Sequence, residues 1–301
     1  MDGVIVQAKP LSRPSLGSLL ELIKPITWFA PIWAFMCGVV SSGAAPLSHW
    51  PLALAGAFLA GPLVCGTSQA VNDWFDREVD AINEPDRPIP SGRVPGRWGL
   101  WVALAGTALS FLYALTLGPW TAAAAAAGLA LAWAYSAPPL RLKQSGWRGP
   151  AAVSFSYEGL AWLTGAAVML QGPPGWPIVA LAVLYSVGAF GIMTLNDFKA
   201  EDGDRALGLR SLPVILGVGP AARLACWFIA VPQGVVVGLL LAWGLPLFAG
   251  LIAALIVGQL LLMRRLLRDP KAHAPWYNAT GTSVYVLGML VSAIGVNSLA
   301  G

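Results

Sequence analysis

The sequence has little charge and few of the residues that build metal clusters or disulfides. Asp, Glu, Lys and Arg make up only 11% of its 301 residues, whereas a soluble globular domain has roughly a quarter. The three cysteines, Cys37, Cys65 and Cys226, share no spacing typical of a disulfide framework or a zinc motif. The two histidines, His49 and His273, lie outside the apolar segments. This placement argues against a haem held permanently between helices.

Apolar residues, at 57% of the chain, are what the sequence has in excess. They form segments of about 20 residues, the length at which a helix crosses a hydrocarbon core of roughly 30 Å. Nine crossings are predicted, at 25–43, 51–71, 98–117, 119–136, 150–170, 176–195, 220–242, 245–263 and 280–298. The expected fold is an all-α integral membrane protein. Residues 1–301 would form one membrane domain, with an N-terminal segment (1–24) and a nine-helix bundle (25–298).

Basic residues are missing from one side of this predicted bundle. If the N-terminus is cytoplasmic, all 18 Lys and Arg residues fall on the cytoplasmic side, in the segments 1–24, 72–97, 137–149, 196–223 and 264–275. Such a bias sets the orientation of membrane proteins. We therefore expect a cytoplasmic N-terminus and a C-terminus on the opposite side. The net charge of +4 then reflects topology, and no nucleic-acid partner is expected.

Acidic residues gather in two of the same cytoplasmic segments, which topology does not require because Asp and Glu contribute little to it. The two acidic loops, 72–97 and 196–219, contain "NDWFDREVDAINEPDRPIPSGR" (72–93) and "NDFKAEDGDRALGLRSLPVILG" (196–217). Each begins with Asn-Asp directly after an apolar segment and has an acid eight residues after the Asn. The two loops lie four helices apart and so face the same way. We expect them to share one central cavity.

The first acidic loop predicts a metal-binding face. Asn72, Asp76 and Asp80 follow an i, i+4, i+8 spacing, which places them on one face of a helix. Oxygen ligands gathered in this way favour a hard cation, and Mg²⁺ binds through one or two carboxylates and substrate phosphates. The second loop could hold another Mg²⁺ across a diphosphate. Cationic side chains suited to its phosphate oxygens are Arg77, Arg87, Arg93, Arg205, Arg210 and Lys143. For any single acid, the alternative is a surface ion pair, such as Asp73 with Arg77.

The first loop resembles the N-x-x-x-D-x-x-x-D signature of the UbiA-type intramembrane prenyltransferases. This resemblance covers nearly the whole chain. With "YSAPPLRLKQSGW" (135–147) and "SYEGLAWLTG" (156–165), both loops resemble the chlorophyll and bacteriochlorophyll synthase branch. Bacteriochlorophyll synthases are the expected group within it, since the chain is short at its N-terminus and shows no plastid-type transit segment.

The resemblance implies transfer of a geranylgeranyl or phytyl group from its diphosphate to the propionate carboxylate of chlorophyllide or bacteriochlorophyllide. It implies two Mg²⁺ ions, for which Mn²⁺ can substitute. The setting it implies is the bilayer of a bacterial inner or intracytoplasmic membrane, with the site open to the cytoplasm. Pigment-biosynthesis and photosystem-assembly proteins are candidate partners.

The resemblance also implies roles for individual residues. The implied catalytic residues are Asp76, Asp80, Asp204 and Lys143, and the implied metal ligands are Asn72, Asp76, Asp80 and Asp204. Tyr135 and Lys143 match diphosphate-binding positions. Many relatives carry D-x-x-x-D in the second loop, but here the earlier position is Ala200. Asp197 or Glu201 is expected to replace it as a metal ligand.

Four residues within the predicted crossings are candidates for the acceptor side of a cavity. Glu158 is the one acid inside a predicted crossing, and an intramembrane carboxylate is a functional candidate by default. The alternative for Glu158 is a packing role, neutral or hydrogen-bonded. Phe155, Trp162 and Phe190 are candidate pocket residues, whereas tryptophans at the predicted loop ends fit an interfacial belt.

Three other functions remain open from the sequence. The first is a prenyltransferase of the same fold that acts on a quinone or haem precursor. The second is a cation transporter, although transport carboxylates are expected near the bilayer midplane and ten of the 14 acids lie in the two cytoplasmic loops. The third is a pigment-binding scaffold without catalysis, which would leave both acidic segments unused.

Overall fold

The computed structural model describes residues 13–44, 48–206 and 208–299, and within them it contains helices but no β-strand. The helices of the first half are α1 (Leu16–Leu22), η1 (Pro25–Trp28), α2 (Phe29–Ser41), α3 (Trp50–Phe58), η2 (Leu59–Cys65), α4 (Gly66–Asn83), α5 (Trp98–Thr116) and α6 (Pro119–Ser136). The π-helical segment η2 joins α3 and α4 into one helix of 34 residues. This helix ends just before the Glu-Pro pair at 84–85, because a residue that precedes proline disfavours helical geometry.

The second half begins with a loop that contains the short η3 (Leu142–Gln144). Its other helices are α7 (Arg148–Ser154), η4 (Phe155–Leu160), α8 (Ala161–Leu170), α9 (Trp176–Asn196), η5 (Asp197–Lys199), α10 (Glu201–Ala206), α11 (Leu212–Leu216), α12 (Val218–Ala242), α13 (Pro246–Leu266) and α14 (Pro270–Asn297). Proline opens α6, α13 and α14, where its missing N–H costs no hydrogen bond.

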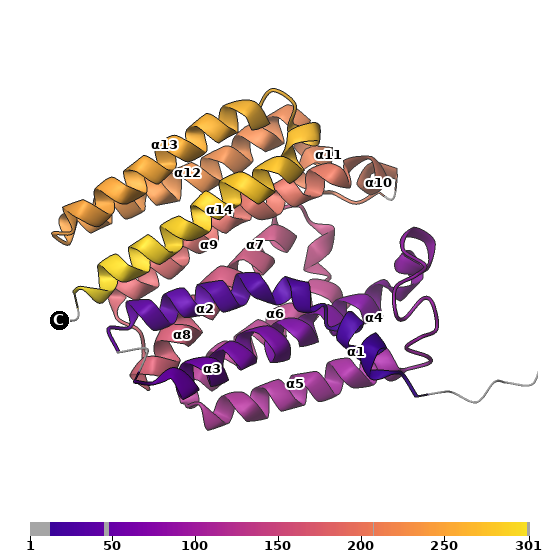
Figure 1. Ribbon diagram of the computed structural model, residues 1–301. Helices are drawn as coiled ribbons and strands as arrows, with labels where there is room; N and C mark the ends of the chain where they lie inside the picture. The colour runs from indigo at the N-terminus through magenta and orange to yellow at the C-terminus, as the bar shows by residue number, and fades with distance from the viewer. Residues whose placement is uncertain (1–12, 45–47, 207, 300–301) are drawn as a thin grey trace, which may run out of the picture.

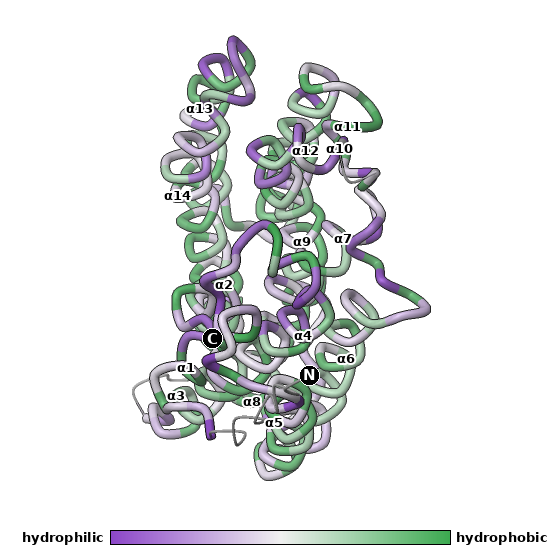
Figure 2. The backbone as a smooth tube through the Cα atoms, turned by 90° about the vertical axis from the view of Figure 1, so that its right-hand side faces the viewer, coloured by the Kyte–Doolittle hydropathy of each residue, from purple (hydrophilic) through white to green (hydrophobic). Residues whose placement is uncertain are grey.

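The long helices run side by side in two groups (Figure 1). One group contains α9, α12, α13 and α14, and the other contains α2 to α6 and α8. The loop after α4 and the short helices α10 and α11 lie at one end of the bundle, and the C-terminus lies at the other. The middle parts of the long helices are mostly apolar, and many hydrophilic residues lie in the connecting segments (Figure 2). Both acidic loops therefore lie at the same end of the bundle, as the repeated pattern predicts.

Six helices in the described part of the chain are long and apolar enough to cross a membrane, or seven if the bent pair Leu16–Leu22 and Pro25–Ser41 counts as one span. The other two predicted crossings are helical but fall outside this group. One is the alanine-rich α6, and the other is the run 148–170. The chain is thus an all-α, multi-pass membrane protein, and nine crossings remain a prediction.

Helices α2 and α8 pack backbone to backbone through glycine. A Cβ atom on Gly38 would lie 2.0 Å from the carbonyl oxygen of Trp162, and one on Gly165 would lie 2.0 Å from that of Phe35. Such close approach through small residues is a common way to join helices in a membrane. It fixes α2 against α8 on one side of the central cavity.

We expect Gly38→Ala to lower the thermal stability of the purified protein, because the added methyl group would push α2 away from α8. Overpacking of this kind costs about 1–3 kcal/mol. Gly250→Ala on α13 is the matched control, since a Cβ there meets no atom within 4 Å. Thermal unfolding in detergent measures both changes, and equal melting temperatures for the two variants would contradict the packing described.

Candidate functional site

A cavity of about 680 Å³ is enclosed by segments from both halves of the chain. Its walls come from η2, α4, α6, α7, η4, α8 and the end of α9. Its charged lining residues are Asp76, Asp80, Arg87, Arg141, Lys143, Asp197 and Asp204. These charges lie at the end near the loops. Farther along the helices the lining is small and apolar, with Leu59, Ala60, Val64, Ala124, Ala125, Gly128 and Leu160. The cavity therefore combines a charged mouth with an apolar interior.

The first acidic motif lies on the cavity wall with one cation against it. Asn72, Asp76 and Asp80 all line the cavity from α4. Lys143, in η3, donates hydrogen bonds to the Oδ1 atoms of Asp76 and, at 3.3 Å, of Asn72. Burial lowers the pKa of Lys143, although the hydrogen bond to Asp76 acts in the opposite direction. The Lys143 ammonium group joins the loop after α6 to the metal-binding face predicted on α4.

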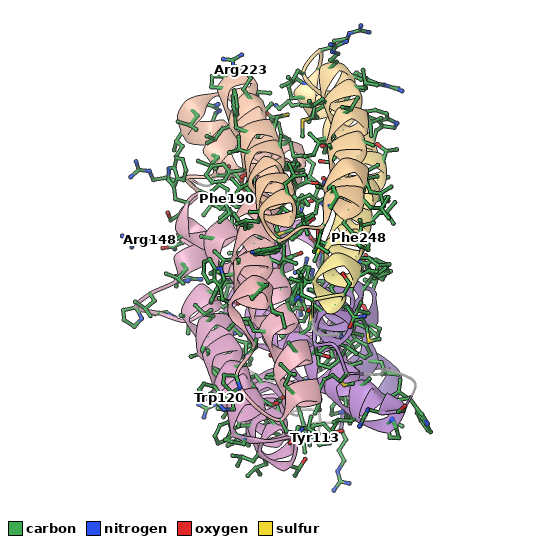
Figure 3. The ribbon with its side chains drawn as sticks, turned by 90° about the vertical axis from the view of Figure 1, so that its left-hand side faces the viewer. Tyr113, Trp120, Arg148, Phe190, Arg223 and Phe248 are labelled. Carbon is green, nitrogen blue, oxygen red and sulfur yellow. The ribbon has the colours of Figure 1, made fainter. Side chains whose placement is uncertain are left out.

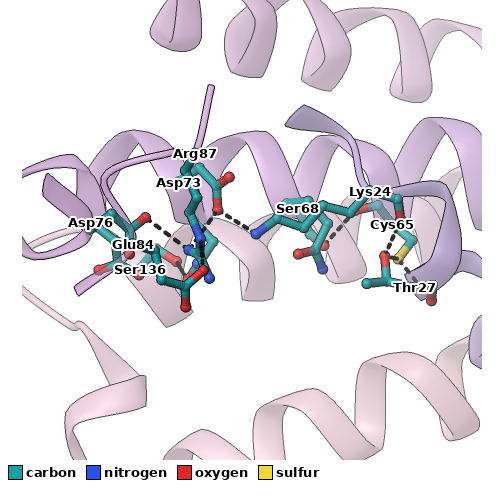
Figure 4. A network of polar contacts seen from close by, with 12 residues as sticks. Lys24, Thr27, Cys65, Ser68, Asp73, Asp76, Glu84, Arg87 and Ser136 are labelled. Atoms are coloured by element: carbon teal, nitrogen blue, oxygen red, sulfur yellow. Dashed lines mark hydrogen bonds and ion pairs between the residues drawn. The ribbon is translucent and has the colours of Figure 1, made fainter. Parts of the chain in front are cut away.

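Arg87 supplies a second cation at the mouth. Its guanidinium contacts Asp80 at 2.8 Å, Glu84 at 2.5 Å and Asp73 at 3.5 Å. Burial lowers the pKa of Arg87, but the hydrogen bond to Glu84 and the charges of Asp73 and Asp80 outweigh it and raise the pKa. The chain folds back in the turn after α4, so that Arg87 contacts the side of α4 that carries Asp73 and Asp80 (Figure 4).

Asp73 supports this arrangement from outside the cavity lining. Its side chain is only 1% exposed, and its Oδ1 atom accepts a hydrogen bond of 2.6 Å from Lys24 (Figure 4). Lys24 lies between α1 and η1, so the contact ties the N-terminal segment to α4. Asp73 therefore pairs with Lys24 and Arg87, and does not form the surface ion pair with Arg77 that was considered from the sequence.

The second acidic motif contributes two carboxylates to the same cavity. Asn196, Asp197 and Asp204 all line it. Glu201 does not, because it lies buried in an ion cluster with Arg205 and Lys271, each at 2.5 Å. The hydrogen bonds from Lys271 and then Arg205 lower the pKa of Glu201 to about 2. Of the two candidates to replace the acid missing at Ala200, the structure brings only Asp197 to the cavity.

Four arginines predicted to bind phosphate are not among the cavity-lining residues. The guanidinium of Arg77 lies 4.4 Å from the Trp74 ring centroid, and Arg93 pairs with Glu21 on α1. Arg205 pairs with Glu201, as described above. Arg210 contributes its backbone, since its carbonyl oxygen accepts a hydrogen bond of 2.8 Å from Gly146 N–H. The structure thus places these four side chains away from the cavity lining, and their binding of phosphate stays a prediction.

Three further residues line the cavity that were not expected there from the sequence: Arg141, Gln69 and Tyr157. The Nε atom of Arg141 is buried and has no hydrogen-bond partner in the described residues. The motif around Lys143 could have identified Arg141, which stands two residues before it. No charge pattern could have identified Gln69 or Tyr157. Tyr135, which the sequence predicted, also lines the cavity, in the last turn of α6.

The predicted acceptor-side residues do not line this cavity. Trp162 is fully buried, where it donates to Ser41 at 3.0 Å and stacks on Tyr185. Phe155 and Phe190 line a separate apolar hollow of about 500 Å³, and Figure 3 shows Phe190 on the flank of the bundle. Glu158 is buried in η4, and its Oε2 atom has no hydrogen-bond partner among the described residues. Trp162 therefore packs between helices, and an acceptor-side role for Glu158 stays a prediction.

The donor atoms at the mouth fit Mg²⁺ held together with a phosphate-bearing ligand. Among the described residues, no group of three or more His, Cys, Asp or Glu side chains could hold a metal ion alone. Mg²⁺ needs no such cage, since it keeps several waters and takes one or two carboxylates plus substrate phosphates. Asp76, Asp80, Asp197 and Asp204 offer oxygen donors from two segments around one cavity.

Comparison with known proteins decides the family. Residues 29–293 match the UbiA prenyltransferase family. The chain belongs to this family. The enzyme class that the sequence motifs predicted, a prenyltransferase, is confirmed by this match.

Two relatives place the chain near the bacteriochlorophyll synthases within the UbiA family. The chain is 59% identical to the bacteriochlorophyll synthase 33 kDa chain of Cereibacter sphaeroides, over 96% of each protein. It is 51% identical to the protein of the same name from Rhodobacter capsulatus, over 95% of each. The predicted resemblance to the bacteriochlorophyll synthase branch is therefore confirmed.

A solved structure supports the fold. A UbiA homolog from Archaeoglobus fulgidus bound to GPP and Mg²⁺ superposes with a TM-score of 0.69, covering 89% of this chain and 99% of that protein. The two sequences are 19% identical, so the similarity speaks for the fold alone. The predicted all-α UbiA-type fold is confirmed.

Replacing Asp197 and Glu201 separately tests the placement of the second motif. We expect Asp197→Asn to reduce turnover about a hundredfold, because it removes charge from the cavity. We expect Glu201→Gln to keep turnover within about threefold and to lower the melting temperature, because it weakens the ion pairs of a buried carboxylate with Arg205 and Lys271.

The pKa of Glu201 adds a pH signature. A carboxyl whose pKa is lowered on folding stabilises the protein above its unfolded pKa of about 4.3. That stability is lost as the pH falls toward about 2. The melting temperatures of wild type and Glu201→Gln should therefore converge on acidification.

Loss of turnover with Glu201→Gln and normal turnover with Asp197→Asn would contradict the placement of the second motif and would make Glu201 the residue that acts in the cavity.

Proposed function

We propose that this protein transfers a geranylgeranyl or phytyl group from its diphosphate to the propionate carboxylate of bacteriochlorophyllide or chlorophyllide. The observation that carries the proposal is the single cavity that both acidic motifs line, in a chain 59% identical to a bacteriochlorophyll synthase chain. The product is the esterified pigment. The acidic mouth would bind the diphosphate, and the apolar interior would take the isoprenoid chain.

The group transfer requires one bond to break and one to form. The bond between the allylic C1 and the diphosphate oxygen breaks, and its electron pair leaves with the diphosphate. A propionate oxygen donates a pair to C1 and forms the ester. Carboxyl pKa values lie near 4, so the propionate is already ionised at neutral pH and no general base has to deprotonate it.

The charged mouth would stabilise the negative charge that develops on the leaving diphosphate. Two Mg²⁺ ions, for which Mn²⁺ substitutes, would neutralise this charge, held by Asn72, Asp76 and Asp80 on one side and Asp197 and Asp204 on the other. Lys143 and Arg87 are fixed by contacts to the same carboxylates and face the same space. Charges fixed before the reaction stabilise its transition state without reorganisation. A UbiA homolog of the same fold binds GPP and Mg²⁺, which supports a prenyl diphosphate and Mg²⁺ as the ligands.

The apolar interior would exclude water from the allylic carbon. Leu59, Val64 and Leu160 line it with small alanine and glycine residues, so the walls offer few groups that hydrogen-bond water. Water would otherwise capture the allylic group as an alcohol. The charged mouth would lie in the cytoplasmic half of a bacterial inner membrane. There the diphosphate would enter from the cytoplasm and the isoprenoid chain from the bilayer. The strongly one-sided distribution of basic residues supports this orientation.

The proposal is tested by supplying membranes that contain the protein with each chlorin and each isoprenoid diphosphate, and by identifying the esters by mass. We expect an esterified chlorin in the presence of Mg²⁺ and loss of at least about 95% of it in excess chelator, with recovery on adding Mg²⁺ or Mn²⁺. A prenylated quinone or haem precursor formed in preference to any chlorin ester would contradict the proposed acceptor. Undiminished product in chelator would contradict the proposed metal.

A further inference from the structure

Two π-helical turns line the same cavity. These are η2, at the junction of α3 and α4, and η4, at the junction of α7 and α8. A π-helical turn is rare, and those that occur inside α-helices are frequently at functional sites. Here the two turns touch, because the Sγ atom of Cys65 in η2 lies 3.4 Å from the hydroxyl oxygen of Tyr157 in η4. The contact places the Tyr157 hydroxyl where the two π-helical turns meet.

Tyr157 crosses from one wall of the cavity to the other. Its backbone belongs to η4, but its hydroxyl oxygen accepts a hydrogen bond of 2.9 Å from the side-chain amide of Gln69 on α4. Cys65 holds the same oxygen from η2. Since all three residues line the cavity, the Tyr157 ring extends between its two walls.

The Tyr157 hydroxyl is held about one helical turn farther along α4 from the loops than the first acidic motif. Gln69 precedes Asn72 by three residues on α4, which is about 4.5 Å along the helix. With the diphosphate bound at Asn72, Asp76 and Lys143, the allylic carbons follow directly toward the interior. Within the described residues, only Tyr135 and Tyr157 are aromatic members of the cavity lining, and Tyr135 lies near the mouth.

We propose that Tyr157 is a catalytic residue whose ring face stabilises the positive charge that develops on the allylic carbons. This inference rests on the proposed function, and specifically on an allylic diphosphate as the prenyl donor. As the C1–oxygen bond breaks, its electron pair leaves with the diphosphate and positive charge spreads over C1 and C3. The π-face of an aromatic ring attracts such a cation, most strongly away from water. The propionate oxygen then donates its pair to C1.

The two hydrogen bonds to the Tyr157 oxygen fit this role. Gln69 and Cys65 hold the oxygen against the α4 wall. A phenol oxygen free in the cavity could itself attack the cation and form an ether. Tying the oxygen to the wall leaves the ring face as the part of the side chain available to the allylic group.

The test varies the electron density of the ring at constant shape. Purified protein is prepared with Phe, 3,4,5-trifluorophenylalanine or Leu at position 157, and single-turnover rates and the KM for geranylgeranyl diphosphate are measured. We expect Tyr157→Phe to keep the rate within about threefold. The fluorinated ring should be about tenfold slower than Phe, and Tyr157→Leu about a hundredfold slower than wild type, with KM changed less than about threefold.

Two results would overturn the proposal. Equal rates with Phe and trifluorophenylalanine would show that ring electrons do not matter, and a loss with Phe as large as with Leu would assign the effect to the hydroxyl. Phe228, which lines the separate hollow, is replaced by the same fluorinated residue as a control and should leave the rate unchanged. Diphosphate release is measured together with ester formation. Release with transfer to another acceptor would contradict the proposed acceptor and would still measure the role of Tyr157.

Discussion

The arrangement of the whole site depends on carboxylates that are held against cations at one end of an apolar bundle. Uncompensated, four aspartates around one cavity would repel one another and oppose the packing of the helices that carry them. Lys143 on Asp76 and Arg87 on Asp80 relieve part of that repulsion. Because each cation comes from a loop and each acid from a helix, the same contacts also fix the loops. The contacts that relieve the repulsion are therefore the contacts that position the loops at the cavity mouth.

The fold and the first motif could be predicted from sequence because they follow simple periodicities. Apolar segments of membrane-crossing length gave the helices, and the four-residue spacing of Asn72, Asp76 and Asp80 gave their common face. The two acidic loops were placed together because positively charged loops lie on one side of a membrane. Each of these inferences needs only a local pattern and a general rule.

The differences between the sequence expectations and the structure concern partners that no local pattern specifies. Arg93 has the charge to bind phosphate, but the fold places Glu21 beside it. Glu201 has the position of a metal ligand, but Lys271, seventy residues away along the chain, neutralises it. Trp162 is aromatic and lies in a promising motif, yet the close approach of α2 and α8 buries it. Which charges face the cavity depends on tertiary contacts, and these come from segments far apart in the sequence.

If the two acidic motifs act on one diphosphate, replacing an acid in one motif should change the effect of replacing an acid in the other. The most direct measurement is a double-mutant cycle on the affinity for a non-reacting prenyl thiodiphosphate in the presence of Mg²⁺, using Asp76→Asn, Asp197→Asn and the combined variant. A shared site predicts strong coupling, so that the combined variant binds about tenfold or more differently from the product of the single effects. Additive effects would show two independent sites and would contradict the account.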